Sequence, residues 1–229
     1  MATNRVIYQV EGLFVGPTPA TGQHYIAAGI PTGANAGNLV SGLNRIQDIS
    51  YGFTIPRVDI NQFGELAPID RIILEQPTVN LSFSYLQANL WNEKVLGLSI
   101  SSGTEVSAVS GLINKTTDNK NYFIPMATEG TDLIGTNSQT LPVIGIGNGF
   151  ISSFSAEGAV GQIPKTSITV QGLNMEFEST SSGNFIPAVN PSDGTANTSW
   201  RYQIPVGLSS PVQLSGVSAL RPGDITLTV

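Results

Sequence analysis

The sequence of 229 residues has no cysteine and a single histidine, His24. Without cysteine there are no disulfides, no thiolate metal sites and no cysteine nucleophile, and the redox compartment stays open. His24 lies in a segment rich in Gly and Pro that has no Gly-x-Ser-x-Gly motif, so a histidine-based metal site or serine triad is not supported. We therefore expect no catalytic residue, no cofactor and no metal, and predict that the chain is not an enzyme.

Charge is also scarce. Only 11% of the residues are charged, and sixteen acids against ten bases give a net charge of −6, whereas about 25% is typical of soluble domains. No stripe of Lys and Arg could release counterions from a phosphate backbone, so tight nucleic-acid binding is not expected. A surface of hydroxyl and amide groups repels copies of itself weakly. The composition therefore favours self-assembly.

The N-terminal part lacks a continuous apolar run, because Gln9 and Glu11 interrupt the stretch from Val6 to Val15. Neither a signal peptide nor a membrane span is supported by this pattern. We expect the protein to be made in a cytoplasm and not to insert into a membrane.

Two pairs of acids could in principle serve glycoside hydrolysis, namely Glu176 with Glu178 and Glu129 with Asp132. The first pair would share the solvated side of a strand, and the second lies in a turn-like Glu-Gly-Thr-Asp stretch. The Gly-rich residues 145–149 lack the G-x-G-x-x-G spacing of a nucleotide-binding loop and predict a turn before a strand. These features favour structural roles.

Alternating apolar and polar residues predict strands. In Thr78–Tyr85, every second residue from Val79 is apolar and the others are hydroxylated or amidic. Residues 46–60 alternate similarly until Pro56 breaks the phase, which predicts a bulge or bend. Turn residues in 61–68 join these segments into a long hairpin from about 45 to 85. Residues 150–170 read as a weaker copy of this hairpin, followed by a strand over 173–178.

One segment, about 86–97, is predicted to be a helix, because its apolar residues recur at helical spacing and a capping box can form from Ser84 and Gln87. Residues 12–44 and 179–229 are rich in Gly, Pro and Ser and predict irregular arms or long loops. The expected fold is a single all-β domain over 1–229, a β-sandwich or barrel with long hairpins and one short flanking α-helix.

Several of these segments together resemble the major tail tube proteins of tailed bacteriophages. The residues that carry the resemblance are Ile46–Tyr51, Asn61–Leu66 and Glu75–Tyr85, which match the long hairpin of that family with its Gly-containing tip and its Pro-x-Val entry to the return strand. Residues 89–97 stand where the family has its helix, and residues 150–174 resemble its second hairpin. The resemblance covers about half of the chain and rests on order and spacing.

The resemblance implies a structural virion protein whose two hairpins join those of its neighbours into a continuous barrel. Such rings, usually hexameric, stack into a tail tube through which DNA is ejected. The implied partners are other copies of the chain, the tail terminator, tape measure and baseplate or tip proteins, and a sheath if the tail is contractile, which the sequence leaves open. DNA would pass transiently without tight binding, and the protein would be found in the virion tail.

Two sets of residues follow as candidate sites. Strand alternation predicts a polar face that lines the lumen, and the apolar residues in the turn of the first hairpin predict a loop that stacks on the adjacent ring. The lumen-facing candidates are Asp48, Ser50, Asn80, Ser82, Ser155, Glu157 and Thr169. The stacking candidates are Asn61, Gln62, Phe63, Gly64, Glu65, Leu66 and Ala67.

Other functions remain open at this point. A head decoration, neck or baseplate protein, or the tube subunit of a secretion or injection machine, would have a similar sequence pattern. A carbohydrate-binding module would also be all-β and weakly charged, but such modules present exposed aromatic platforms, and only Trp91 and Trp200 are available.

Overall fold

The computed structural model describes residues 6–17, 41–64, 66–73, 75, 77–88, 90–98, 119–128, 133, 141–179 and 187–189. Within these ranges the chain consists of antiparallel strands and one short helix, as the all-β class predicts. His24, Glu65, Glu129, Asp132 and most of the segment after Ser179 lie outside the described residues.

Two layers of strands share one long strand, β9 (Pro142–Glu157). The first layer, here called the hairpin sheet, has the order β4–β7–β10–β9 and contains the second half of β9. Its other strands are β4 (Ile46–Thr54), β7 (Thr78–Leu86) and β10 (Lys165–Gly172). Both predicted hairpins are therefore confirmed, because β4 pairs with β7 and β9 pairs with β10.

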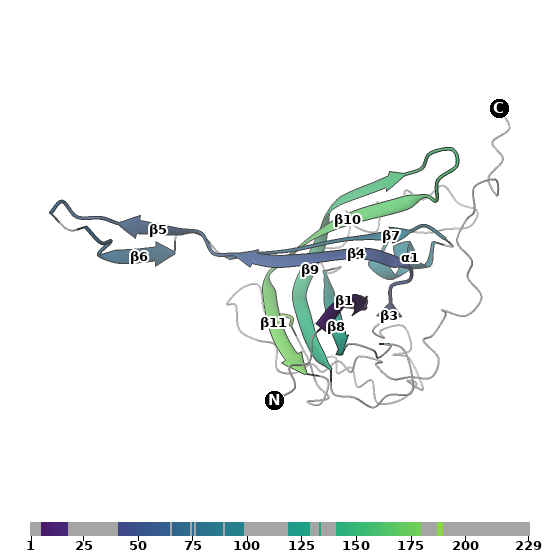
Figure 1. The fold of residues 1–229 in the computed structure, drawn as a ribbon, viewed down its shortest axis with the longest axis horizontal. Coiled ribbons are helices and arrows are strands. Elements are labelled where there is room, and N and C mark those ends of the chain that lie inside the picture. The colour runs from purple at the N-terminus through teal and green to yellow at the C-terminus, as the bar shows by residue number, and fades with distance from the viewer. Residues whose placement is uncertain are drawn as a thin grey trace.

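The second layer, the base sheet, is built around the first half of β9, which lies between β8 (Lys120–Thr128) and β11 (Asn174–Ser179). Figure 1 shows β9 running from its place beside β8 and β11 into the hairpin sheet, where it lies beside β10. Three more strands lie on the other side of β8. These are β1 (Val6–Glu11) and β2 (Phe14–Pro17), which both pair with β8, and β3 (Ser41–Gly42), which pairs with β2.

The core lies between the two sheets. On β7 the alternation has the expected result: the side chains of Val79, Leu81, Phe83 and Tyr85 are buried. They pack against residues of the base sheet such as Tyr122, whose ring centroid is 6.3 Å from that of Phe83. Burying each such side chain stabilises the fold by about 1.5–3 kcal/mol. The hydrophobic effect thus fixes which face of the hairpin sheet points inward.

The beginning of the segment 12–44 differs from the expected irregular arm. Residues Phe14–Pro17 form β2, and Leu13 and Val15 are fully buried in the core. This short strand pairs with β8 on one side and with the two-residue β3 on the other. Four residues are too few for an apolar–polar alternation to be recognised. The high Gly and Pro content therefore predicted an irregular arm where the structure has a core strand.

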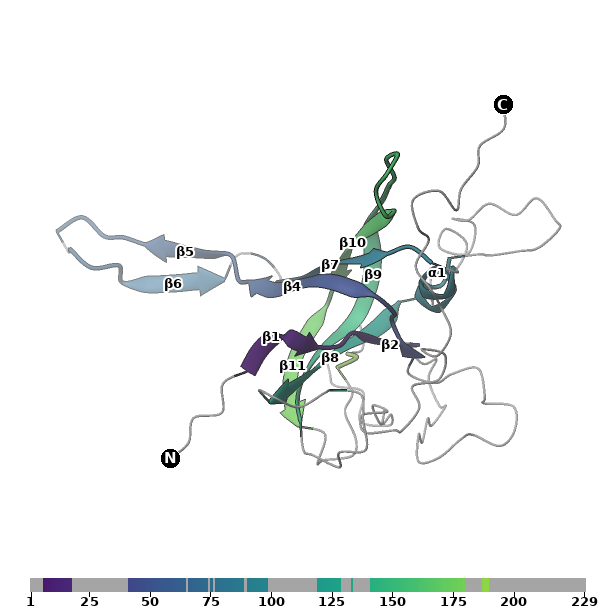
Figure 2. The same ribbon diagram turned by 45° about the vertical axis from the view of Figure 1, so that its right-hand side comes forward.

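The helix is shorter than predicted. Helix α1 spans Trp91–Leu96, and Leu86, expected at its start, instead ends β7 opposite Lys165. The predicted capping box does not form, because the residue at the N-cap is Leu90, which has a left-handed backbone and makes no side-chain cap. Strand pairing thus wins over local helix propensity at the 84–88 boundary. The helix covers one end of the sandwich, beside β7 and the start of β4 (Figure 2).

Neighbouring segments closely approach the backbone of β9 where this strand passes from one layer to the other. A Cβ on Gly147 would lie 1.9 Å from the carbonyl oxygen of Pro187, and a Cβ on Gly149 would meet the Tyr122 ring and Val170. Asn148 has a positive φ of 53°, and its side chain accepts a hydrogen bond from the backbone of Val189. The Gly-rich stretch 145–149 is therefore part of a strand, and the prediction of a preceding turn is wrong. The glycines leave room for neighbouring chain segments.

The tip of the first hairpin forms an arm that projects away from both layers (Figure 1). It is a separate two-stranded sheet made of β5 (Arg57–Ile60) and β6 (Asp70–Ile73). The ladder between β4 and β7 ends at the Thr54–Thr78 pair, just before Pro56, so the predicted break in that strand is confirmed.

Candidate assembly surfaces

One face of the hairpin sheet is hydroxylated across all four of its strands. Ser50 lies opposite Ser82, Ser82 opposite Thr169, and Thr169 opposite Ser153. One neighbouring row contains Asp48, Ser167 and Ser155. The other contains Asn80, Gln171 and Phe150, whose ring is half-exposed among the polar side chains. Because opposite residues in a ladder project to the same face, these side chains form one surface, here called the polar face.

All seven predicted lumen residues belong to this polar face. Their side chains are exposed, except that of Thr169, which is half-buried. The register therefore brings together residues that are up to 109 positions apart, from Asp48 to Glu157. Whether the face lines a lumen stays a prediction.

Some residues of the polar face were not among those predicted from the sequence. Lys165 lies opposite Glu157, so the face carries a base beside its acids. Ser153, Ser167 and Gln171 also belong to it, and the alternation around Ile168 and Val170 could have identified the last two. Ser84 is an exception, since its side chain is buried and its hydroxyl has no hydrogen-bond partner among the described residues.

Each side of the hairpin sheet ends in a strand edge. On one side β4 is last in the order. On the other side, residues 150–157 of β9 pair with β10 but extend past the reach of β8, whose ladder ends at Gly149. Within the described part of the chain, both edges thus lack a second partner strand. Unpaired edges are templates for pairing with another chain.

The two edge strands run in opposite directions. The pairs β4–β7, β7–β10 and β10–β9 are all antiparallel, and three reversals leave β9 antiparallel to β4. If copies are placed side by side with their polar faces aligned, β4 of one copy meets β9 of the next as an antiparallel pair. Head-to-tail contacts of this type close into rings when the rotation between copies permits it.

The apolar side of the sheet is incompletely covered at these edges. Phe53 on β4 and Phe154 on β9 lie on the core-facing side, yet their side chains are 56% and 45% exposed. Phe177 on edge strand β11 is similarly exposed on the core side. The centre of the sheet is closed by its own second layer, but its margins are not.

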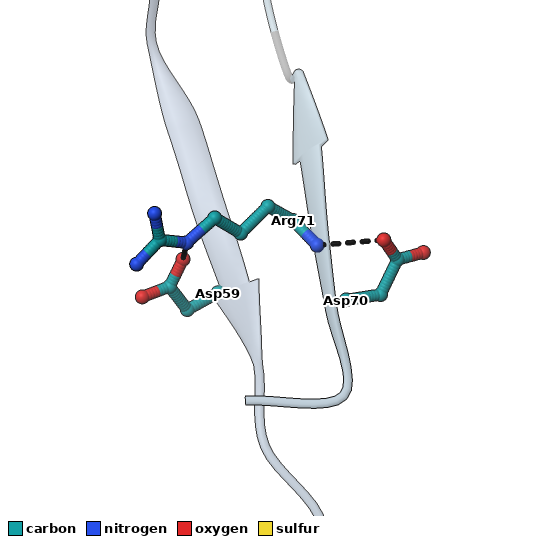
Figure 3. A network of polar contacts seen from close by, with 3 residues as sticks. All are labelled: Asp59, Asp70 and Arg71. Carbon is teal, nitrogen blue, oxygen red and sulfur yellow. Dashed lines mark hydrogen bonds and ion pairs between the residues drawn. The ribbon is translucent and has the colours of Figure 1, made fainter. Parts of the chain in front are cut away.

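Apolar side chains dominate one face of the arm. Val58, Ile60 and Ile72 share this face of the β5–β6 ladder, here called the apolar face, and are all exposed; Asp70, opposite Ile60, is its acidic member. On the other face Arg71 forms an ion pair with Asp59, with 2.8 Å between Nε and Oδ1 (Figure 3). Asp70 accepts a hydrogen bond from the backbone N–H of Arg71 at 2.7 Å (Figure 3). The ion pair is solvated and contributes little stability. Ile73, opposite Arg57, is also exposed on this second face, so both faces of the arm present apolar side chains.

The predicted stacking loop caps this arm. Phe63 and Leu66 are fully exposed, and Gly64 has a positive φ of 98°, which suits glycine at a sharp reversal. Neither side chain folds back onto the sandwich. The turn between β5 and β6 lies at the end of the arm farthest from the sandwich (Figure 1), and the apolar side chains of Phe63 and Leu66 are exposed in this turn.

Burial and neighbouring carboxylates raise the pKa values of two ionisable side chains, Tyr85 and Glu176. Tyr85 donates a hydrogen bond to Glu93 of α1 at 2.9 Å, and burial followed by the Glu93 charge raises the pKa of Tyr85. Burial, then the charge of Glu178, raises the pKa of Glu176 on β11. Among the residues in the described ranges, no three His, Cys, Asp or Glu side chains gather into a metal site.

The helix α1 is too short to cross a membrane, and no described helix is long and apolar enough to do so.

No protein-family model matches the sequence, and no curated protein matches it. Solved structures with a similar fold include the tube-terminating cap of the anti-feeding prophage, with a TM-score of 0.45, 8% identity, and coverage of 78% of this chain and 94% of that chain. The sheath-tube complex of the extracellular contractile injection system PVC has a TM-score of 0.43, 10% identity, and coverage of 76% and 92%. The SPP1 tail tube has a TM-score of 0.42, 10% identity, and coverage of 76% and 79%. The names of these structures describe a tube-terminating cap, a sheath-tube complex and a tail tube.

Proposed function

We propose that the chain is the ring-forming subunit of a phage tail tube, in which the polar face of the hairpin sheet lines the channel. The observation that carries the proposal is the pair of antiparallel sheet edges on a sheet with one hydroxylated and one apolar side. Pairing β4 of each copy with β9 of the next would extend the same polar face around a closed barrel. A ring of six copies is the number that the family resemblance implies.

The chemistry of the polar face suits a conduit for DNA. Hydroxyl and amide side chains form most of it, and Asp48 and Glu157 outnumber the single base Lys165. Lys and Arg bind phosphates by releasing counterions, so a wall with few of them lets DNA slide without holding it. The apolar side meanwhile faces the core, which leaves the base sheet on the outside of the barrel.

The arm supplies contacts along the tube axis. Its apolar tip residues Phe63 and Leu66 and its apolar face are unpaired in the single copy. Burying even one such side chain on the adjacent ring contributes about 1.5–3 kcal/mol, and repetition around a ring makes stacking cooperative. The arm therefore acts as the stacking element of the tube.

Electron microscopy of the purified protein tests this function. We expect hollow tubes, or rings under conditions that weaken stacking, and the channel should admit double-stranded DNA. Particles that remain monomers or compact trimers over a wide range of concentration and salt would overturn the proposal and favour a decoration protein. Tubes whose channel is too narrow for DNA would retain the tube subunit but exclude DNA conduction.

A further inference from the structure

The apolar margins of the hairpin sheet lie on the strands that the proposed function pairs between copies. We propose that Phe53 of one copy packs against Phe154 of the next copy and forms an aromatic seam on the core-facing side of each junction. The inference rests on the proposed ring and goes further, because it names the register of the junction and the side chains that hold it.

Within one copy, the two Phe side chains belong to different rows of the strand ladder. Phe154 lies opposite Ile168, Ile168 opposite Phe83, and Phe83 opposite Ile49. Phe53 is four residues farther along β4 and lies opposite Val79. An unstaggered junction would therefore place Phe154 beside Ile49 of the next copy, not beside Phe53.

Closure of a barrel requires each copy to be shifted along the strand direction relative to the next. Strands in barrels tilt by about 35–45°, which at a spacing of roughly 4.8 Å shifts each strand by about one residue relative to its neighbour. Over the four strands of one copy this adds up to about four residues. Only an even shift keeps the polar face continuous, because an odd shift would turn β4 over. Four residues satisfy both conditions.

The direction of the shift follows from where β4 begins. In one direction, four rows of the ladder lead from Ile49 to Phe53. In the other, the bulge between Ile46 and Asp48 places Ile46 two rows away, so four rows lead beyond the first residue of β4. Arg45 precedes β4, and its φ of 58° takes it out of extended geometry. A shift toward Phe53 keeps Phe154 opposite an extended strand, whereas the other direction would leave Phe154 without a β4 partner. The structure therefore favours the Phe53 register.

The environment of both rings agrees with burial by a second copy. Phe53 and Phe154 are half-exposed aromatic side chains on a face that is otherwise core. An aromatic pair brought to this position would continue the row of core side chains from one copy to the next. Directly opposite residues in an antiparallel pair have Cβ atoms about 4.5–5.5 Å apart, close enough for the two rings to touch.

Cysteine crosslinking tests the register, and the chain is suited to it because it has no cysteine of its own. The variant with Phe53→Cys and Phe154→Cys should, on mild oxidation of the assembled protein, form a disulfide between copies and give a ladder of covalent oligomers. The matched control with Ile49→Cys and Phe154→Cys should give less than a tenth of that crosslinking. An equimolar mixture of the two single variants, Phe53→Cys and Phe154→Cys, should stop at covalent dimers.

A second readout measures the seam without cysteine. Phe53→Ala should raise the concentration at which half of the protein is assembled by about tenfold. Phe177→Ala removes an exposed ring from β11, outside the junction, and should leave that concentration unchanged. Both variants should retain the wild-type melting temperature of the single copy.

The outcomes separate this inference from the proposed function. Efficient crosslinking of the Ile49 pair, or no crosslinking of either pair in a protein that forms rings by electron microscopy, would overturn the seam while the ring remains. A wild-type protein that forms neither rings nor tubes would overturn both.

Discussion

Asn92 of helix α1 makes two hydrogen bonds to the backbone of Asn44: its amide nitrogen donates to the Asn44 carbonyl at 2.8 Å, and its oxygen accepts from the Asn44 N–H at 2.9 Å. Both residues are buried. Asn44 lies just before β4, so this contact fixes the point at which the edge strand of the hairpin sheet begins.

Replacing Asn92 with Ala should therefore lower the free energy of unfolding by about 2–3 kcal/mol, because two buried backbone groups lose their partners. Chemical denaturation would measure this change. Asn80→Ala, at an exposed position of the polar face, should change stability by less than about 0.5 kcal/mol. Equal effects of the two substitutions would show that the Asn44 contact is not stabilising.

Gly147→Ala should also destabilise the protein, since its Cβ would collide with the carbonyl of Pro187. Relief of the collision requires residues 187–189 to move off β9, and overpacking of this kind costs about 1–3 kcal/mol. Gly158→Ala is the matched control, because nothing lies within 4 Å of its added Cβ. Thermal unfolding of both variants gives the comparison, and an unchanged melting temperature for Gly147→Ala would mean that the 187–189 contact is dispensable.

The pH dependence of stability has a definite sign at Glu176. Burial and the Glu178 charge raise the pKa of Glu176 above its ordinary value of 4.5 in the folded protein. The folded state therefore binds this proton more tightly than the unfolded state does, and the resulting stability is complete below the unfolded pKa and is lost as pH rises through the folded pKa. Glu176→Gln should raise the melting temperature at pH 7 but not at about pH 3.

Glu178→Gln provides the internal check on that prediction. It removes one of the two causes of the raised pKa of Glu176 and should weaken the pH dependence without abolishing it. A melting temperature of Glu176→Gln that parallels wild type at every pH would contradict the assignment.

The stacking role proposed for the arm predicts that substitutions at its tip affect assembly and leave folding intact. Phe63→Ser combined with Leu66→Ser removes two side chains that contact nothing in the single copy, so the melting temperature should not change. The variant should form rings that stack into short tubes or none. Long tubes from the double variant would exclude the stacking role, whereas a large drop in melting temperature would show that the tip supports the fold.

The polar face predicts how charge affects the passage of DNA. Asp48→Lys with Glu157→Lys should permit assembly but slow DNA ejection at low salt, because added bases hold phosphates. Asp48→Asn with Glu157→Gln removes the acids without adding bases and should eject DNA at nearly the wild-type rate. Normal ejection kinetics in the lysine variant at low salt would contradict the account of the channel wall.

The strands with strict alternation were predictable, because the burial of Val79, Leu81 and Phe83 requires a period of two. The same rule placed the predicted polar residues on one face, since a ladder carries the phase of each strand to its neighbours. The tip residues Phe63 and Leu66 were identifiable because apolar side chains are unexpected in a turn.

Other features depended on tertiary contacts that leave no local pattern. Leu13 lies just before a strand that is too short to alternate, and Val15 lies within it. The start of α1 is displaced because Leu86 pairs with Lys165 in the ladder. Residues 143–149 of β9 are buried on both faces and therefore show no apolar–polar alternation. Without that alternation, their Gly-rich sequence predicted a turn. The relative direction of the two edge strands, on which the proposed ring depends, follows from a strand order that no single segment encodes.

A reconstruction of the assembled protein by cryo-electron microscopy, at a resolution that separates strands, would show directly how the copies pair. We expect a continuous antiparallel barrel in which β4 of each copy lies beside β9 of the next, with Ser50, Ser82, Thr169 and Ser153 facing the channel. An assembly in which these hydroxyl groups face outward, or in which β4 and β9 are not neighbours across the junction, would contradict it.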